Sequence, residues 1–466
     1  MRIRLAYGRS GLQVSLPEGL NLEVVEPNYV PGLPDQGGAV REALRKAIGC
    51  RPLRELVKQS DVVGIVVNDI TRPTPYHTIL PVLLKEIDHI RDDYITLLVA
   101  TGTHRQNTEA ELAMMLGEQA TDRFRIVQND ACDRASHSPV GKTSGGNEVW
   151  LHKDYLACDV RILTGFIEPH FFAGFSGGGK ACMPGLALLE TVVRNHSPQN
   201  LDHPKATWGV TRGNPVWQEI QEAARMAGPT VLLNVALNRD RQITAVFAGD
   251  VEQAHECGCA FVKRHAMVPV SRGYDIVITS SSGYPLDLNV YQSVKAMSAA
   301  AQIVRDGGTI IVAADCWDGI PDHGEYKRLL FEAESPASLL KRIRGGPPPR
   351  LASPALASPP LLSVTADKGV RAEDAGAGAF RCSPDIIGMW QAQIHASICE
   401  KADVYLFSHN LTDKEIEQAM LKPCRDIAET VGQLLRSYGR DAPICVLPDG
   451  PQTIPYFQTC KRSESP

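Results

Sequence analysis

Short apolar segments that alternate with helical segments set the strongest limit on how this chain can fold. Residues 61–68 (Asp-Val-Val-Gly-Ile-Val-Val-Asn) and 95–100 (Ile-Thr-Leu-Leu-Val-Ala) are almost uninterrupted apolar runs. Helices are expected over about 78–90 and after Thr108, where Glu111 completes a capping-box spacing. Apolar strands separated by helices are typical of a mainly parallel sheet with helices on both faces. The pattern therefore predicts an α/β fold.

The same alternation starts again near residue 274, so we expect two domains, each with a mainly parallel sheet flanked by helices. In the second half the expected strands are 275–279, 309–314, 404–408 and 444–447, and the expected helices are 290–305, 389–400 and 414–437. A chain of 466 residues also exceeds what one hydrophobic core usually serves. We assign residues 1–270 to an N-terminal domain and 271–450 to a C-terminal domain, with the active site in the cleft between them.

Two segments stand apart from this alternation. Residues 345–382 are rich in proline, alanine, glycine and serine, a composition that buries little apolar surface, so a mobile insertion is expected there. Residues 451–466 form a tail that we expect to return to the N-terminal domain.

The composition argues against several classes of function. A net charge of −5 without a long basic block argues against nucleic acid as the partner. No apolar run of about 18 residues is present, so no membrane span is expected. The first residues lack the apolar segment of a signal peptide, and the scattered cysteines suggest reduced thiols. These features predict a cytoplasmic protein.

The most distinctive stretch, residues 165–180, reads Gly-Phe-Ile-Glu-Pro-His-Phe-Phe-Ala-Gly-Phe-Ser-Gly-Gly-Gly-Lys. Three consecutive glycines tolerate positive φ and allow a bound group to approach the backbone closely. Their N–H groups can also form a nest for an anion. Lys180 ends the turn, and His170 and His196 flank it. An amine and two imidazoles around one glycine-rich turn predict a cofactor or metal site.

Other interpretations of this stretch are open at this point. A phosphate-binding P-loop needs Ser or Thr after its lysine, whereas Ala181 follows Lys180. A lysine beside a phosphate nest also suits a Schiff base with pyridoxal phosphate, and a surface turn with a solvated lysine is the plainest alternative. Cys257 and Cys259 form the only tight cysteine pair, and one pair is too few for a zinc site.

Polar residues follow the carboxyl ends of the expected strands, where ligands of open α/β sheets bind. After residue 68 come Asp69 and Arg72, a guanidinium fork for a carboxylate or phosphate with an acidic residue to orient it. His104 follows residue 100 and suits acid–base chemistry near neutral pH. Gln292 and Lys295, three residues apart, share one face near an expected helix start. Taken singly, each is equally compatible with a surface residue.

Together these motifs resemble those of the nickel-dependent lactate racemase family (LarA-like proteins), in order and over nearly the whole chain. The matching segments are 68–73 (Asn-Asp-Ile-Thr-Arg-Pro), 100–105 (Ala-Thr-Gly-Thr-His-Arg), 166–170 (Phe-Ile-Glu-Pro-His), 176–180 (Ser-Gly-Gly-Gly-Lys), 195–196 (Asn-His) and 284–295 (Tyr-Pro-Leu-Asp-Leu-Asn-Val-Tyr-Gln-Ser-Val-Lys).

The resemblance implies a cofactor and a set of site residues. The cofactor is a nickel-pincer nucleotide, a pyridinium-3-thioamide-5-thiocarboxylate mononucleotide, carried covalently on Lys180, with His196 as the nickel ligand. The implied catalytic acid/base pair is His104 and His170. The implied binding residues are Asp69, Arg72, Gln292 and Lys295, of which Arg72 and Lys295 also hold the substrate carboxylate.

The implied activity is inversion of the C2 centre of a small 2-hydroxy acid, lactate or a related acid. Hydride leaves C2 for the cofactor while one histidine takes the hydroxyl proton, and the planar 2-keto acid can be reduced again on either face. The implied partners are this acid and the proteins that make the cofactor, without nucleic acid or membrane. The alternatives are a pyridoxal- or nicotinamide-dependent enzyme and a non-catalytic nickel- or nucleotide-binding protein.

Overall fold

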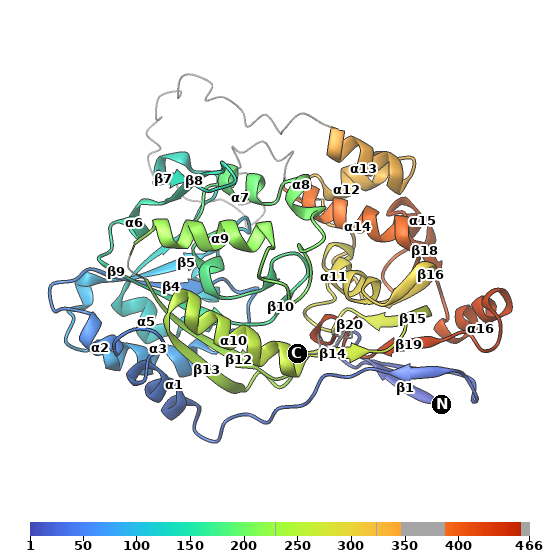
Figure 1. Cartoon of the computed structure of the whole chain (residues 1–466), viewed down its shortest axis with the longest axis horizontal. Helices are drawn as coiled ribbons and strands as arrows, with labels where there is room; N and C mark the ends of the chain where they lie inside the picture. The colour runs from blue at the N-terminus through green and yellow to red at the C-terminus, as the bar shows by residue number, and fades with distance from the viewer. Residues whose placement is uncertain (229, 323, 346–386, 458–466) are drawn as a thin grey trace, which may run out of the picture.

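The computed structural model describes residues 1–228, 230–322, 324–345 and 387–457, and within them two six-stranded sheets are each flanked by helices (Figure 1). The strand orders are β13-β12-β9-β4-β5-β6 and β18-β17-β16-β15-β19-β3. Every pairing within these two sheets is parallel except that of β12 with β13. The predicted two-domain α/β fold with mainly parallel sheets is thereby confirmed.

The first sheet lies at the left of Figure 1. Its strands are β4 (Val63–Asn68), β5 (Ile95–Ala100), β6 (Arg125–Gln128), β9 (Val160–Phe166), β12 (Thr230–Leu237) and β13 (Ile243–Asp250). The helices of this half are α1 (Gln36–Arg45), α2 (Leu53–Leu56), α3 (Tyr76–Glu86), α4 (Glu109–Leu116), α5 (Glu118–Arg123), α6 (Lys153–Leu156), α7 (Leu189–Asn195), α8 (Pro198–Leu201), α9 (Pro215–Met226) and α10 (Val251–Ala266).

Strand β4 is apolar throughout because both of its faces are buried. Ile65 and Val67 belong to one hydrophobic cluster, and Val66 belongs to the cluster on the opposite face of the sheet. Because successive side chains of a strand point to opposite faces, a strand covered on both sides needs apolar residues at every position. The predicted capping box is also present, with Thr108 and Glu111 each bonded to the other's backbone at the start of α4.

The second sheet lies at the right of Figure 1. Its strands are β3 (Leu22–Val24), β15 (Tyr274–Ser280), β16 (Val304–Ala313), β17 (Asp403–Phe407), β18 (Lys422–Cys424) and β19 (Ile444–Leu447). The helices of this half are α11 (Val290–Ala301), α12 (Tyr326–Glu332), α13 (Pro336–Gly345), α14 (Met389–Lys401), α15 (Asp413–Gln418) and α16 (Ile427–Tyr438).

Four two-stranded pairings complete the described strands. They are β1 (Arg2–Leu5) with β2 (Leu12–Ser15), β7 (His137–Lys142) with β8 (Glu148–His152), β10 (Pro169–His170) with β11 (Gly174–Phe175), and β14 (Met267–Val270) with β20 (Ile454–Phe457). The short 3-10 helices are η1 (Asp92–Tyr94), η2 (Arg134–Ser136), η3 (Gly178–Ala181) and η5 (Gly450–Gln452).

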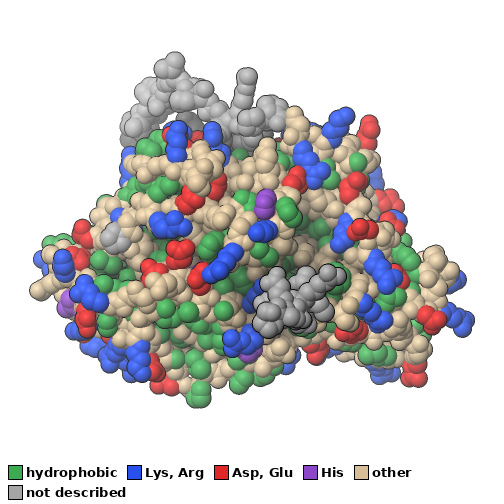
Figure 2. All heavy atoms as spheres, in the orientation of Figure 1, with side chains coloured by type: hydrophobic (Ala, Val, Ile, Leu, Met, Phe, Trp, Pro, Cys, Tyr) green, Lys and Arg blue, Asp and Glu red, His purple; other side chains and the backbone are tan. Residues whose placement is uncertain are grey.

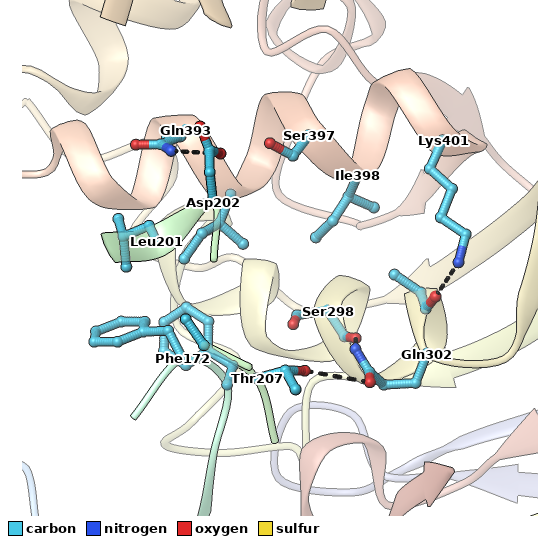
Figure 3. Close-up of a pocket in the computed structure, with 14 residues that line it drawn as sticks. Phe172, Leu201, Asp202, Thr207, Ser298, Gln302, Gln393, Ser397, Ile398 and Lys401 are labelled. Carbon is cyan, nitrogen blue, oxygen red and sulfur yellow. Dashed lines mark hydrogen bonds between the residues drawn. The ribbon is translucent and has the colours of Figure 1, made fainter. Parts of the chain in front are cut away.

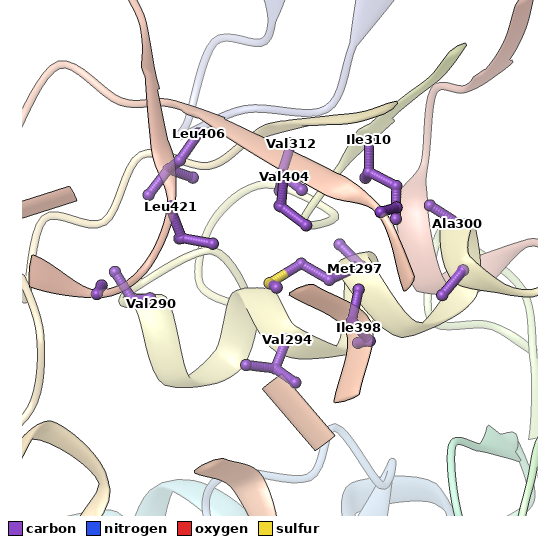
Figure 4. Packing of buried hydrophobic residues seen from close by; sticks show 14 of the residues in the cluster. Val290, Val294, Met297, Ala300, Ile310, Val312, Ile398, Val404, Leu406 and Leu421 are labelled. Atoms are coloured by element: carbon purple, nitrogen blue, oxygen red, sulfur yellow. The ribbon is translucent and has the colours of Figure 1, made fainter. Parts of the chain in front are cut away.

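Helix α11 is held rigidly, which matters because it carries Gln292 and Lys295. The Asn289 side chain accepts a hydrogen bond from the Gln292 N–H at 3.0 Å and so caps the helix. Figure 4 shows Val294 and Met297 of α11 within the core that also contains Val312 and Val404 of the sheet. The packing therefore fixes the face of α11 on which the two polar residues lie.

One expected helix differs from the structure. The helix expected over 414–437 is two helices, α15 and α16, separated by strand β18, because Pro423 cannot donate the hydrogen bond that a helix interior requires. Strand β3 pairs with β19, and the β1–β2 hairpin packs in the cluster that contains Ile276 and Val446. Residues 2–24 thus lie with the second sheet.

The remaining expectations about organisation stay predictions. The domain limits 1–270 and 271–450 are not tested, and nearly all of the expected insertion at 345–382 lies outside the described residues. The described end of the tail forms β20, which pairs with β14, and Ile454 packs with Met267 in the cluster of the first half.

The surface and the thiols bear on the expected class of protein. Among the described residues, no helix is both long and apolar enough to span a membrane. On the described part of the face in Figure 2, Lys and Arg side chains are interspersed with Asp and Glu rather than gathered in one basic area. Within the described ranges, nine cysteines are free thiols, whereas Cys132 is disulfide-bonded, so the expectation of reduced thiols does not hold for Cys132.

Candidate active site

The glycine-rich turn follows β9 and leads through the small β10–β11 hairpin into η3. Gly177 and Gly178 have φ of +74° and +58°, the left-handed region that favours glycine. A Cβ at Gly178 would lie 2.7 Å from Cγ of His255, and the Gly178 N–H donates to Oδ1 of Asn234 at 2.8 Å. The turn is thus packed tightly against protein atoms, and the Gly178 N–H is not available to an anion, contrary to the expected nest.

Lys180 lies in η3 with its amine half-buried. Burial lowers the pKa of Lys180 well below its usual value, and the positive charges of Arg72 and Lys295 lower it further, against the opposing charge of Glu168. Its Nζ lies 5.6 Å from the centre of the Phe172 ring. The lowered pKa increases the fraction of Lys180 present as the free amine, which is the form that reacts as a nucleophile.

His196 follows the last residue of α7 and is buried. Its Nδ1 lies 3.1 Å from Oδ1 of Asn195, an acceptor, so Nδ1 carries the proton and Nε2 keeps its lone pair. The ring packs edge-on against Phe172 and against Trp390 of α14, with centroid distances of 4.9 and 5.3 Å. Burial, and next the charge of Lys180, lower the pKa of His196 to about 3. A neutral imidazole of this kind is suited to bind a metal.

His170 lies in β10 and packs against the same aromatic side chain, Phe172, as His196 does. Its ring is edge-on to Phe172 at 4.5 Å, and its Nδ1 accepts the Ala173 N–H at 3.2 Å. Burial lowers the pKa of His170 well below its usual value, and the charges of Lys180 and Arg72 contribute in the same direction. His170, Lys180 and His196 therefore all surround Phe172.

His104 and Asp69 form a hydrogen-bonded pair at the ends of two neighbouring strands. Asp69 follows β4, His104 lies four residues beyond β5, and Nδ1 of His104 donates to Oδ2 of Asp69 at 2.7 Å. Asp69 also accepts from Oγ1 of Thr71 at 2.6 Å. Burial alone would raise the pKa of Asp69, but the bonds and charges of His104, Thr71 and Arg72 bring it below its usual value. The ionised carboxylate holds the imidazole in one tautomer with Nε2 outward.

Arg72, Lys180 and Lys295 place one guanidinium and two amines near a single carboxylate, that of Glu168. Nη1 of Arg72 lies 3.2 Å from Oε1 of Glu168, and the charge of Glu168 also acts on both lysines. Burial, followed by repulsion from Arg72, lowers the pKa of Lys295 to about 8. Arg72 and the protonated Lys295 outweigh this one carboxylate, and the excess of positive charge favours a bound anion.

Gln292 is the predicted site residue with the fewest contacts. It lies on the same face of α11 as Lys295, and its side-chain amide has no hydrogen-bond partner among the described residues. The other seven predicted residues are linked to one another by hydrogen bonds, by shared contact with Phe172 or by mutual electrostatic effects. They come from the first half of the chain, except Lys295, so the site lies where the two halves meet.

Several residues of this site were not predicted with a role. Glu168 and Asn195 stand inside the matched motifs, but nothing in the sequence shows that one balances the cations and the other bonds to His196. Trp390 follows residues 346–386 and belongs to no motif, and Phe172 reads as an ordinary apolar residue. Of these residues, only Glu168 carried a usable sequence signal, because it lies inside the matched segment 166–170 next to His170.

A cavity of about 270 Å³ lies beside this site, between the two halves (Figure 3). Phe172 and Asp202 line it from the first half, and Ser298 and Gln393 line it from α11 and α14. Nε2 of Gln393 donates to Oδ1 of Asp202 at 2.9 Å, so this hydrogen bond joins the halves across the cavity. Phe172 is shared between the cavity wall and the three-residue cluster described above.

The described residues contain no group of three His, Cys, Asp or Glu side chains able to hold a metal ion by themselves. Of the cysteine pair, Cys257 is exposed, and Cys259 is buried with its Sγ 3.5 Å from Nε2 of His255. A metal at the site would need donors from a bound cofactor in addition to His196.

Fold and site together define a two-domain α/β protein in which histidine, lysine and arginine side chains gather where the two halves meet. Matches to two family models cover much of the chain: the lactate racemase N-terminal domain over residues 7–209 and the lactate racemase C-terminal domain over residues 270–349.

Individual relatives agree with these models. A lactate racemase from Thermoanaerobacterium thermosaccharolyticum is 32% identical over 97% of this chain and 98% of its own length, and one from Lactiplantibacillus plantarum is 34% identical over 88% and 89%. The structure of the lactate racemase apoprotein from T. thermosaccharolyticum superposes with a TM-score of 0.83 at 30% identity, covering 98% of this chain and all of that one. A crystal structure of a Thermotoga maritima protein shares the fold, with a TM-score of 0.64 at 17% identity over 92% of this chain and all of that one.

The chain belongs to the lactate racemase family and is therefore an isomerase. The predicted family and the predicted class of enzyme are both confirmed.

Proposed function

We propose that this protein racemises lactate, or a closely related 2-hydroxy acid, with a covalently bound nickel-pincer nucleotide. The observation that carries the proposal is the gathering of Lys180, His170 and His196 around Phe172, with Arg72 and Lys295 adding positive charge near Glu168. The names of the two racemases that share 32–34% identity with the chain support lactate as the first substrate to test.

The residues present fit this cofactor. Lys180 offers a half-buried amine with a lowered pKa for the covalent bond, and His196 offers Nε2 for nickel. Arg72 and Lys295 offer the positive charge that a nucleotide phosphate and a substrate carboxylate require. When bound, the cofactor supplies an electrophilic carbon that accepts a hydride from C2 of the substrate and returns it.

The substrate is held by its carboxylate. Arg72 is already engaged with Glu168, whereas Lys295 is half-buried and protonated below pH about 8, so it is the first candidate for the carboxylate contact. A fixed carboxylate leaves C2 and its hydroxyl as the groups that can turn toward one histidine or the other.

The two histidines handle the hydroxyl proton from different starting states. Asp69 accepts the Nδ1 proton of His104, so Nε2 of His104 is ready to take a proton, and the carboxylate then stabilises the imidazolium. His170 accepts the Ala173 N–H at Nδ1, which leaves the proton of its neutral ring on Nε2. To act on the hydroxyl, the His170 ring must give up this hydrogen bond and carry its proton on Nδ1. Nε2 can then take the hydroxyl proton as a base, and the imidazolium that forms can return it as an acid.

The partners and the location follow from the same proposal. Proteins that synthesise the cofactor must deliver it to Lys180, and the cytoplasm is the compartment that we propose for both. Neither a nucleic acid nor a membrane has a role in this reaction.

The test combines intact-mass spectrometry with a chiral assay on cofactor-loaded protein. We expect an added mass that Lys180→Ala abolishes, and inversion of each lactate enantiomer that His104→Gln and His170→Gln stop. His265→Gln, which replaces a histidine packed on Phe261 away from the site, is the matched control and should stay active.

Three outcomes would contradict the proposal. If active protein carried an unmodified Lys180, the claim that the cofactor is covalently bound would be refuted. The absorption of a pyridoxal Schiff base would favour the rival cofactor. If the loaded protein inverted no acid in a panel of 2-hydroxy acids, the proposed racemase activity would be refuted.

A further inference from the structure

A chain of buried hydrogen bonds leads away from His196 into the first half of the molecule. Nδ1 of His196 donates to Oδ1 of Asn195, and Nδ2 of Asn195 donates to Oε2 of Glu219 at 3.0 Å. Asn195 has no exposed surface, and Glu219 is 8% exposed. The imidazole, the amide and the carboxylate therefore form one connected series shielded from water.

The orientation of the Asn195 amide is set by its other contacts. Nδ2 also donates to the backbone carbonyl of Val216 at 3.1 Å, so both of its protons have acceptors. Turning the amide over would place its oxygen against the carbonyl and the carboxylate, leaving all three acceptors unpaired. Oδ1 must therefore face His196, where it can only accept a proton.

Glu219 is itself anchored on its far side. It is placed by α9, and its carboxylate accepts from Nδ2 of Asn147 at 3.2 Å and from Oγ1 of Thr143 at 3.4 Å. Among the described residues no Lys or Arg forms an ion pair with it. Its negative charge is therefore balanced by hydrogen bonds alone, and it strengthens Asn195 as an acceptor for His196.

We propose that Glu219 and Asn195 are positioning residues that hold His196 as the Nδ1–H tautomer, with the lone pair on Nε2. This inference rests on the proposed function, in which His196 is the nickel ligand. A neutral imidazole binds a metal through the nitrogen that lacks the proton, and a hydrogen bond at the other nitrogen fixes both tautomer and ring direction. Phe172 and Trp390, packed edge-on against the ring, restrict its rotation.

The first measurement uses the cofactor-free protein, so it does not depend on loading. Histidine-selective ¹⁵N labelling and two-bond ¹H–¹⁵N correlation spectra report which ring nitrogen carries the proton, and loss of a signal in His196→Gln assigns it. We expect the Nδ1–H pattern in the parent protein. Asn195→Leu, close in volume, should move the tautomer ratio about fivefold toward Nε2–H.

Two further variants separate positioning from packing. Glu219→Gln keeps an oxygen that can accept from Asn195 and should retain the parental tautomer, whereas Glu219→Leu should shift it in the same direction as Asn195→Leu. Tyr326→Phe removes a 2.8 Å hydrogen bond to the buried His395 and is the control for losing one such bond elsewhere. It should leave the His196 signal unchanged.

The second measurement follows nickel in cofactor-loaded protein during exposure to a chelator. We expect Asn195→Leu and Glu219→Leu to lose nickel about tenfold faster than the parent, and Glu219→Gln and Tyr326→Phe to match it. If Lys180 carries no cofactor, the proposed function fails while the tautomer measurement still decides this inference.

The inference is overturned if His196 of the parent protein shows the Nε2–H pattern, which needs no variant to fold. It is equally overturned if folded Asn195→Leu keeps the parental tautomer, or if Glu219→Gln and Glu219→Leu behave alike.

Discussion

Lys295→Met should stabilise the cofactor-free protein at neutral pH, because it removes a half-buried positive charge that destabilises the folded state. The pKa of Lys295 falls from 10.5 to about 8, first through burial and then through the charge of Arg72. That difference corresponds to roughly 3 kcal/mol, and discounting for the solvent that reaches a half-buried amine leaves about 2 kcal/mol. Methionine has nearly the same length and no charge, so it can occupy the position without a large cavity.

The sign and the pH range of the effect follow from linkage. Below pH 8 the amine is protonated in both the folded and the unfolded protein, and the folded protein bears the whole cost. Between pH 8 and 10.5 the folded protein loses this proton first, so the parent gains stability with rising pH while the variant does not. The advantage of the variant should therefore be full at pH 7 and absent near pH 10.5.

The assay is thermal unfolding of both proteins across this pH range, followed by circular dichroism. We expect the midpoint of Lys295→Met to lie a few degrees above the parent at pH 7 and to converge with it at high pH. Lys414→Met, at an exposed lysine of α15, is the control and should change little. A lower midpoint, or a gain that does not depend on pH, would refute the electrostatic reasoning. Cofactor-loaded Lys295→Met should meanwhile show a raised KM.

Two further predictions concern the geometry of the site. Asp69→Asn should lower kcat about 100-fold with little change in KM, because an amide no longer selects the His104 tautomer. Racemisation rates measured from each enantiomer test this prediction, and an unchanged kcat would contradict it. Gly178→Ala should destabilise the protein by about 2–4 kcal/mol, because its Cβ meets the His255 ring and φ is +58°. Denaturant unfolding measures this cost, and a loss below about 1 kcal/mol would show that His255 moves aside.

The elements with strong local signals could be predicted from the sequence. Strands β4 and β5 are apolar throughout because both faces are buried, and α4 begins at a capping box that depends only on residues close in sequence. The start of β18 was missed because three residues of strand depend on pairing with β17, a contact between distant parts of the chain. The residues on either side of Pro423 have helical patterns, so the sequence predicts one continuous helix without the strand.

The candidate site divides in the same way. Histidines, cations and lysine were predicted because their chemical types and order match a family. The partners that tune them were not, because Glu168, Asn195 and Trp390 act through distances that no spacing encodes. Gly177 and Gly178 show the difference most clearly: their tolerance of positive φ was expected, but atoms that crowd them, from Asn234 and His255, are remote in sequence.

The path of the chain between the two sheets has a mechanical consequence. The first strand of the second sheet in chain order, β3, comes before the whole first half, so that half is an insertion with one chain connection to the second sheet on each side. The tail adds a third link, because β20 follows β19 of the second sheet and pairs with β14 beside the first half. Any opening that admits a cofactor to Lys180 would therefore have to keep this strand pairing or break it.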